Sequence, residues 1–183
     1  MKTMLDTCIW QNFALIKMKK EGKIPKSLEK SKKLWELLEK KVKNKEIDVI
    51  STDWNLLEFR DQITKLVLEK KFIENGYSLT EFKEARKEIQ LDKEDLKVID
   101  DFVFIVPALS GEKTFNANID FKFLWKLCNT GISAFDAIHI QQANDNECDF
   151  FVTRDGELIT KTKKHKLKVK IIDMNSFLSK ISK

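Results

Sequence analysis

The sequence predicts an α/β fold, a three-layer α/β/α sandwich with a mostly parallel sheet. Short apolar runs that are typical of buried strands alternate along the chain with longer stretches in which apolar residues recur at helical spacing. Strands separated by helical crossovers favour a parallel sheet with helices on both of its faces. A chain of 183 residues is long enough to bury a core without disulfides or structural metal, so one domain is expected over residues 1–183.

Two strands are predicted in the first half of the chain. The run "TMLD" (3–6) precedes a helical stretch, and "IDVIS" (47–51) precedes a long helix that begins near Asp53 and ends at Gly76. Between them, a helix is predicted from about residue 27 to 44, where lysines and glutamates separate apolar residues at helical spacing. The apolar stripe of the long helix is Leu56, Phe59, Ile63, Leu66 and Val67.

Two further strands are predicted in the second half. One or two helices are expected from Ser78 to about Val106, and Pro107 is expected to stop them because the residue before a proline disfavours the helical conformation. A loop should follow over residues 108–120. The remaining predicted elements are helices at about 121–128 and 133–145, the strand "DFFVT" (149–153), a short helix from Gly156, the strand "VKIID" (169–173) and a helix over 175–181.

Four acids fall at the end of the sheet where this architecture places its sites. In parallel α/β sheets, sites collect beyond the carboxyl ends of the strands. Asp6 ends the first strand, and Asp155 follows the strand "DFFVT". Glu58 lies on the first turns of the helix after "IDVIS", and Asp136 lies on the first turn of the helix after the turn "NTGIS". These four acids are therefore the candidate site residues.

Each acid also has a purely structural interpretation. Asp6 and Asp155 precede helical stretches and could act as N-caps. Asp136 could form a variant capping box with Ser133, favoured by the positive end of the helix. Glu58 could be a solvated helix residue. Taken singly, none of the four acids identifies a site.

The four acids considered together indicate a cation. Asp136 shares its helix face with Ile140 and Ala143, so it is expected to point toward the interior, and Asp6 has apolar neighbours on both sides. An ionised carboxylate in such a place costs several kcal/mol unless its charge is compensated. A divalent cation would relieve the repulsion within a cluster of four partly buried acids. Ligands that are all oxygen select Mg²⁺ or Mn²⁺ over zinc.

Four segments of the chain resemble a known family. They are "MLDTCIW", "STDWNLLEF", "SAFDAIHIQQA" and "FFVTRDGELI", in that order. They look like the four signature segments of PIN-domain ribonucleases, and in particular of VapC-like toxins of toxin–antitoxin pairs. The resemblance spans almost the whole chain, from Met4 to the final strand and helix. Its most specific pieces are the "DAIH" helix and the strand that ends in "TRD".

The resemblance implies both a site and an activity. The implied site is an acidic pocket built from Asp6, Glu58, Asp136 and Asp155 that binds one or two Mg²⁺ or Mn²⁺ ions, with Thr153 orienting it through its hydroxyl. The implied activity is metal-dependent endoribonucleolytic hydrolysis of RNA phosphodiester bonds. The protein would then be the toxin of a toxin–antitoxin pair. A homodimer and a cognate antitoxin protein are the implied partners, beside the RNA substrate.

The chain departs from the family pattern in two places. Cys8 stands where family members often carry asparagine, two residues after the first aspartate, which affects a secondary hydrogen bond and not the metal ligand. The chain is also longer than the compact toxins. The excess lies roughly at residues 72–121, where a helical insertion could form a lid, a partner surface or an element of RNA specificity.

Several other residues have two interpretations each. Arg154 could contact phosphate or simply lie at the surface. His139 could be a packed or surface histidine, or could hydrogen-bond a metal ligand. The tryptophans are expected to be core or interface anchors, although Trp54 could stack on a base. The three cysteines lack the spacing of a zinc site and are interpreted as reduced packing residues.

The charge and the N-terminal sequence set further expectations. The net charge of +5 permits a polyanionic partner, and "KTKKHKLKVK" from Lys161 could be a solvated connection or an RNA-contacting patch. No signal peptide or apolar run of membrane-spanning length is present, so a cytoplasmic protein without membrane association is expected. An aspartyl phosphatase would need a second acid where Cys8 stands, and a receiver domain would not need the two late acids. The stronger alternative is a PIN-like domain that binds nucleic acid or protein without cleaving.

Overall fold

Four short strands form one parallel sheet in the order β2-β1-β3-β4. The computed structural model describes residues 1–18, 24–78, 80–82, 89–111 and 118–182. All three strand pairings are parallel, so the α/β class and the parallel sheet that the sequence predicts are confirmed. The strands are β1 (Lys2–Leu5), β2 (Asp48–Ile50), β3 (Phe150–Thr153) and β4 (Lys170–Asp173).

The central pair of strands brings the two halves of the chain together. Leu5 of β1 is in register with Val152 of β3, and the next amide, that of Asp6, donates a hydrogen bond to the carbonyl of Val152 at 2.9 Å. Both strands therefore end at the same edge of the sheet. This register places Asp6 and Thr153 side by side at the carboxyl ends of their strands.

Helices fill the connections between the strands at nearly the predicted positions, except that residues 108–110, which were expected to lie in a loop, belong to a helix. Between β1 and β2 lie α1 (Thr7–Met18), a short 3₁₀ turn (Lys26–Leu28) and α2 (Glu29–Lys43). Between β2 and β3 lie α3 (Asp53–Glu74), α5 (Lys93–Val103), α6 (Ile105–Ser110), α7 (Phe121–Cys128) and α8 (Ala134–Asp145). The last two helices are α9 (Gly156–Thr162), before β4, and α10 (Met174–Ile181), after it.

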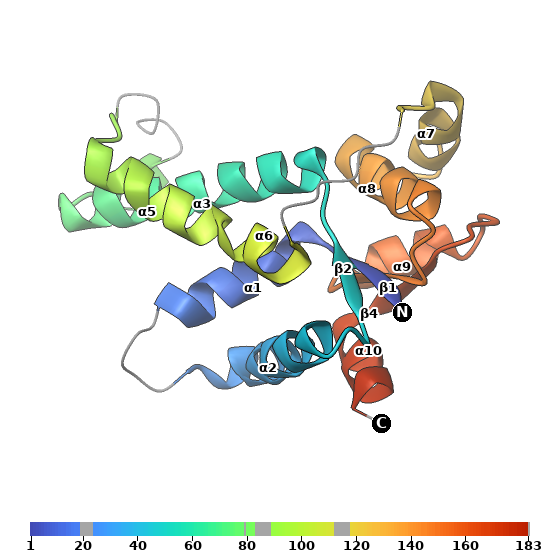
Figure 1. Cartoon of the computed structure of the whole chain (residues 1–183). Helices are drawn as coiled ribbons and strands as arrows, with labels where there is room; N and C mark the ends of the chain where they lie inside the picture. The colour runs from blue at the N-terminus through green and yellow to red at the C-terminus, as the bar shows by residue number, and fades with distance from the viewer. Residues whose placement is uncertain (19–23, 79, 83–88, 112–117, 183) are drawn as a thin grey trace.

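Two apolar cores lie on opposite faces of the sheet. Leu5, Val49 and Val152 pack with the buried faces of α1, α2, α3, α5, α6 and α10. Their strand neighbours Met4 and Ile50, with Phe151, pack with α7, α8 and α9. Alternate residues of a strand point to opposite faces of the sheet, so each strand contributes side chains to both cores. Figure 1 shows α7, α8 and α9 gathered to one side of the strands, an arrangement compatible with three layers.

The expectation that Pro107 stops a helix is wrong. Pro107 lies in the first turn of α6, where a backbone amide has no partner within the helix and proline is tolerated. The break between helices falls instead at Phe104, which ends α5 and precedes α6.

The range 72–121 contains α5 and α6, and its first residues are still part of α3. The side chain of Lys71 in α3 bonds Asp92 and Asp95 at the start of α5, at 2.8 and 2.5 Å, and Arg60 pairs with Asp100. Residues 79, 83–88 and 112–117 of this range lie outside the described residues. That the range is an insertion stays a prediction. Among the described helices, none combines the length and apolar character needed to cross a membrane.

Candidate functional site

All four predicted acids line a single cavity at the carboxyl ends of β1 and β3. The cavity has a volume of about 360 Å³. Asp6 reaches it from the end of β1, Glu58 from α3, Asp136 from α8, and Asp155 from the residue before α9. The full lining is Asp6, Thr7, Cys8, Gln11, Glu58, Gln62, Asp136, Arg154 and Asp155.

The four carboxylates differ in exposure. The expectation of four partly buried acids is wrong for Asp155, which is exposed because it leaves the sheet edge to begin a surface helix. Asp6 is buried, whereas Glu58 and Asp136 are half-buried. Asp136 thus faces the cavity from a half-exposed first turn of α8 and not from the interior. The deepest acid in the cavity is Asp6.

The carboxylate of Asp6 is held by donors from two elements. The hydroxyl of Thr153 donates to Asp6 Oδ2 at 2.5 Å, and the thiol of Cys8 donates to the same oxygen at 3.3 Å. Burial raises the pKa of Asp6, and the nearby charge of Asp136 adds to the rise, although the two hydrogen bonds oppose it. A buried carboxylate of this kind is stabilised by a positive charge placed beside it.

Cys8 packs against the core, as the sequence-based interpretation expects, and it also lines the cavity. Its thiol supplies a hydrogen bond to Asp6 from the position where the family often has asparagine. Burial, followed by the charge of Asp6, raises the pKa of Cys8 to about 12. The thiol is therefore protonated near neutral pH, so it serves as a donor and not as a nucleophile.

Glu58 is fixed from two sides and is not a freely solvated helix residue. Its Oε2 accepts a hydrogen bond from the hydroxyl of Thr7 and lies 2.7 Å from Nε2 of His139. Partial burial acts to raise the pKa of Glu58, but the bonds from His139 and Thr7 outweigh it, and the pKa is lowered. Glu58 is thus held as a carboxylate.

His139 fits both of its predicted interpretations. It is a packed histidine, buried in α8, and it also bonds Glu58, one of the predicted metal ligands. Its Nδ1 is buried and has no hydrogen-bond partner among the described residues. The ring is therefore held by packing on one side and by Glu58 on the other.

Three buried residues form a hydrogen-bond network beside Glu58 that was not predicted from the sequence. Asn55 Nδ2 lies 3.4 Å from the hydroxyl of Thr7, and Asn55 Oδ1 accepts a hydrogen bond from the indole of Trp10 at 3.0 Å. The network connects α1 to α3 beneath the cavity. A usable signal was present for two other lining residues, since Gln11 follows Thr7 and Gln62 follows Glu58 by one helical turn.

Asp136 and Asp155 act as structural groups while lining the cavity. Ser133 caps α8 by accepting from the amide of Asp136, and its hydroxyl donates to Asp136 Oδ2 at 2.6 Å. Oδ1 of Asp155 caps α9 by accepting from the amides of Glu157 and Leu158. The N-cap interpretation of Asp155 is confirmed. Ser133 caps α8 as expected, but the carboxylate of Asp136 accepts from the hydroxyl of Ser133 and not from its backbone amide, as a capping box would require. Asp136 Oδ1 and Asp155 Oδ2 accept no hydrogen bond from the described residues, so both remain available to a ligand.

Arg154 supplies the positive charge in the lining of the cavity. The residue is exposed, and its Nη1 donates to Asn12 Oδ1 at 3.0 Å. The guanidinium is thus tethered at the rim with donors left over. An arginine placed this way can bind a phosphate beside the acids.

The carboxylate oxygens of the cavity are of the donor type that Mg²⁺ and Mn²⁺ prefer. The acids are, however, too far apart in this structure for three of them to hold one ion together. Among the described residues, no three His, Cys, Asp or Glu side chains are grouped closely enough to hold a metal ion. Mg²⁺ commonly keeps several waters and uses one or two carboxylates. The hard oxygen ligands of this cavity suit such a water-rich site.

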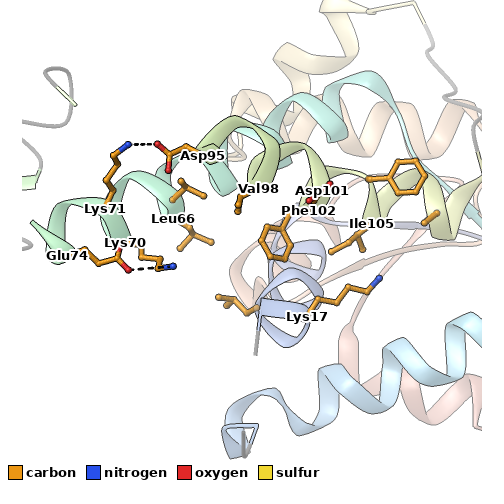
Figure 2. A pocket seen from close by; sticks show the side chains of 14 residues that line it. Lys17, Leu66, Lys70, Lys71, Glu74, Asp95, Val98, Asp101, Phe102 and Ile105 are labelled. Carbon is orange, nitrogen blue, oxygen red and sulfur yellow. Dashed lines mark hydrogen bonds and ion pairs between the residues drawn. The ribbon is translucent and has the colours of Figure 1, made fainter. Parts of the chain in front are cut away.

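A larger cavity lies elsewhere and has a different character. It has a volume of about 830 Å³ and is lined by side chains of α1, α3, α5 and α6 (Figure 2). Four of the charged groups that line it form two ion pairs, Lys71 with Asp95 at 2.5 Å and Lys70 with Glu74 at 3.6 Å. Its interior is formed by groups such as Leu66 and Phe102. The smaller cavity differs in that four acids from four separate parts of the chain line it.

The tryptophans divide between the core and the surface. Trp10 and Trp35 are buried, as expected for core anchors. Trp54 is half-buried and does not line the acidic cavity. Trp125 is exposed on α7.

Comparisons of the chain with protein-family models, curated proteins and solved structures give no match.

Proposed function

We propose that the protein is a metal-dependent endoribonuclease with a PIN-like fold that hydrolyses RNA phosphodiester bonds. The observation that carries this proposal is the convergence of Asp6, Glu58, Asp136 and Asp155 on one cavity at the carboxyl ends of the strands. The resemblance of the four segments around these acids to VapC-like toxins points to the same activity. On this basis the protein is a cytoplasmic toxin with a cognate antitoxin, and it acts as a homodimer.

Each side chain of the cavity has a role in this proposal. Asp6, Asp136 and Asp155 hold a divalent cation directly or through water, and Glu58 completes the site or positions the attacking water. When bound, Mg²⁺ or Mn²⁺ lowers the pKa of water and neutralises charge on the phosphate, so no histidine base is needed. Arg154 binds the phosphate of the scissile strand. The products carry 5′-phosphate and 3′-hydroxyl ends.

The supporting residues hold the acids in place. Thr153 and Cys8 orient Asp6, and Thr7 and His139 orient Glu58. Partners that fix the orientation of ligating groups commonly affect metal affinity or activity by about 10- to 100-fold. The hydrogen bonds around the cavity therefore belong to the proposed machinery.

Cleavage of a labelled single-stranded RNA tests the proposal. Wild type is expected to cleave the RNA with Mg²⁺ or Mn²⁺ and not with EDTA. The variants Asp6→Asn and Asp136→Asn should not cleave it, although their circular dichroism spectra should match that of wild type. Asp61→Asn is the matched control, because Asp61 is an exposed acid of α3 that pairs with Lys65. Unchanged cleavage in the Asp6 and Asp136 variants would remove the proposed site.

The second candidate is a PIN-like domain that binds nucleic acid or protein without cleaving. The absence of a ready group of three metal-binding side chains among the described residues favours it. RNA binding that persists in EDTA, together with no cleavage in either cation, would identify this alternative.

A further inference from the structure

α7 carries an exposed face of alternating aromatic and basic side chains. Leu124 and Leu127 are buried in the core shared with α8, whereas Phe121 and Trp125 are 66% and 69% exposed. These two aromatic residues are one helical turn apart, so they are neighbours on the outer surface of the helix. We call the exposed surface of this helix the α7 face. It consists of Phe121, Lys122, Trp125, Lys126 and Asn129.

The α7 face runs toward the end of α8 that carries Asp136. The amide of Asp120, before α7, donates to Oε1 of Gln141 in the second half of α8 at 3.1 Å. The turn 129–133 then returns the chain to the start of α8, so the two helices are antiparallel. Figure 1 shows them as neighbouring helices at one side of the molecule. The end of α7 therefore lies toward the acidic cavity.

A third exposed aromatic residue lies at the start of α8, and basic residues contact the turn between α7 and α8. Phe135 is 52% exposed and directly precedes Asp136, which lines the acidic cavity. The turn 129–133 is tied to α9 and to the connection after it, because Lys161 Nζ donates to the carbonyl of Gly131 at 2.5 Å, and Thr130 Oγ1 lies 3.0 Å from His165 Nε2. Exposed aromatic groups thus stand on α7 and, at the start of α8, directly before an acid of the cavity.

The composition of the α7 face indicates the chemistry of its partner. The helix contains no acid between Phe121 and Cys128, and within the described residues Lys122 and Lys126 form no ion pair. Contiguous exposed aromatic groups commonly mark a binding surface. A partner that offers both flat rings and negative charge matches aromatic groups interleaved with lysines. Single-stranded nucleic acid has both, because its unpaired bases stack on aromatic side chains while its phosphates meet the lysines.

A second copy of the chain suits this face less well. Symmetric dimer contacts bring the same surface of two subunits together. The α7 face carries two lysines and no acid, so a contact with its own copy would bring four lysines into one interface without a compensating charge from either face, which is unfavourable. An anionic strand has no such conflict.

We propose that the α7 face binds single-stranded RNA, stacks bases on Phe121 and Trp125, and directs the strand past Phe135 to the acidic cavity. The inference rests on the proposed function, since it assigns the route by which the substrate reaches that site. The base faces are hidden in a duplex, so double-stranded RNA of the same length should bind more weakly.

Fluorescence anisotropy in EDTA tests the α7 face without cleavage. The probe is a fluorescein-labelled oligoadenylate of about 12 nucleotides, a length within the range that stacking surfaces cover. Trp125→Ala and Phe121→Ala should each weaken binding by about tenfold, whereas Trp125→Phe should stay within about threefold of wild type because a ring is retained. The double variant Lys122→Gln/Lys126→Gln should reduce the slope of log affinity against log salt by about 1.4, or ~0.7 for each phosphate that a lysine no longer neutralises.

Phe104→Ala is the matched control, because Phe104 is also 66% exposed but lies at the rim of the larger cavity. Circular dichroism checks that each variant is folded. The proposal is overturned if wild type does not bind the probe, if Trp125→Ala binds as wild type does, or if Phe104→Ala loses as much affinity. A change from dimer to monomer in Trp125→Ala, measured by light scattering at unchanged RNA affinity, would instead identify the face as an interface between copies.

These outcomes separate the inference from the proposed function. Metal-dependent cleavage that is lost in Asp6→Asn, combined with binding that does not depend on Trp125, rejects the α7 face alone. Binding that depends on Trp125 without any cleavage retains the α7 face and supports the non-cleaving alternative.

Discussion

Nε2 of His139 lies 2.7 Å from Oε2 of Glu58, joining α8 to α3 across 81 residues of sequence. The contact sits behind the acidic cavity, and Glu58 is fixed on its other side by Thr7. One carboxylate is thereby held by a helix from each half of the chain. Glu58 can present its second oxygen to the cavity while its first stays engaged.

Replacement of His139 should lower the rate of RNA cleavage even under conditions in which the variant remains fully folded. His139→Ala removes a donor to Glu58, so we expect a loss of about 10- to 100-fold in kcat/KM. His139→Gln should recover part of this loss, because its amide can donate to Glu58. The measurement is steady-state cleavage of labelled RNA well below the Tm of each variant. His165→Ala, in the lysine-rich connection, is the control and should leave the cleavage rate unchanged. Equal activity of His139→Ala and His139→Gln would contradict the role of His139 as a hydrogen-bond donor to Glu58.

The hydroxyl of Thr153 should matter for both stability and cleavage. Thr153→Val keeps the shape but removes the donor to Asp6 and the acceptor for the amide of Asp155. Loss of a donor to the buried carboxylate of Asp6 should cost about 1–3 kcal/mol, and cleavage should fall as well because Asp6 is no longer oriented. Urea denaturation and cleavage assays measure the two effects. Thr3→Val is the matched control, because Thr3 is also buried but donates to the carbonyl of Phe150; it should lose stability without losing catalysis.

Without a bound cation, the free energy of unfolding should depend on pH through the ionisation of Asp6. Burial, with a contribution from Asp136, raises the pKa of Asp6 above its unfolded value. The folded state therefore binds this proton more tightly, and the stabilisation is present below the ordinary carboxyl pKa and is lost as pH rises through the raised pKa. At pH 7 in EDTA, Asp6→Asn should therefore raise Tm relative to wild type.

The difference in Tm between wild type and Asp6→Asn should disappear below about pH 4, where the carboxyl is protonated in both states. Thermal melts across the pH range measure it. Mg²⁺ or Mn²⁺ should then raise the Tm of wild type but not that of the variant. A variant that is less stable than wild type at pH 7 would refute the expectation.

Cys8 should resist alkylation in the folded protein. Its pKa is raised to about 12 by burial and then by the charge of Asp6, so almost no thiolate is present at pH 8. Mass spectrometry after iodoacetamide treatment should show Cys8 unmodified until the protein is denatured. Asp6→Asn removes the negative charge beside the thiol and should speed its modification. Rapid labelling of Cys8 in the native wild type would be inconsistent with this environment.

Arg154 should contribute to substrate binding through its charge. Arg154→Gln removes a phosphate-binding group at the rim of the cavity while its amide can still bond Asn12. KM for RNA should rise about tenfold, within the range of a charge-assisted hydrogen bond, with a smaller change in kcat. Arg60→Gln is the control, because Arg60 is a surface arginine paired with Asp100. A loss confined to kcat would assign Arg154 a different role.

The sequence by itself determined the order and type of nearly all elements. The alternation of apolar runs with helical stripes is a local pattern, and it predicted four strands and a parallel sheet. It also indicated which acids follow strands, because the distance in sequence between an acid and the end of a predicted strand can be read directly from the chain. The prediction for Pro107 is wrong because a proline that ends one helix and a proline in the first turn of another look alike in the local sequence.

Only the tertiary structure decided what surrounds each acid. The pairing of Glu58 with His139, the bonds of Asp6 to Thr153 and Cys8, and the exposure of Asp155 depend on contacts between segments far apart in the chain. No local pattern specifies such contacts, because they arise when the parallel register of β1 and β3 brings the strand ends to one edge. Burial and charge at a carboxylate are properties of that assembled edge, and they set its pKa and the ligand it can hold.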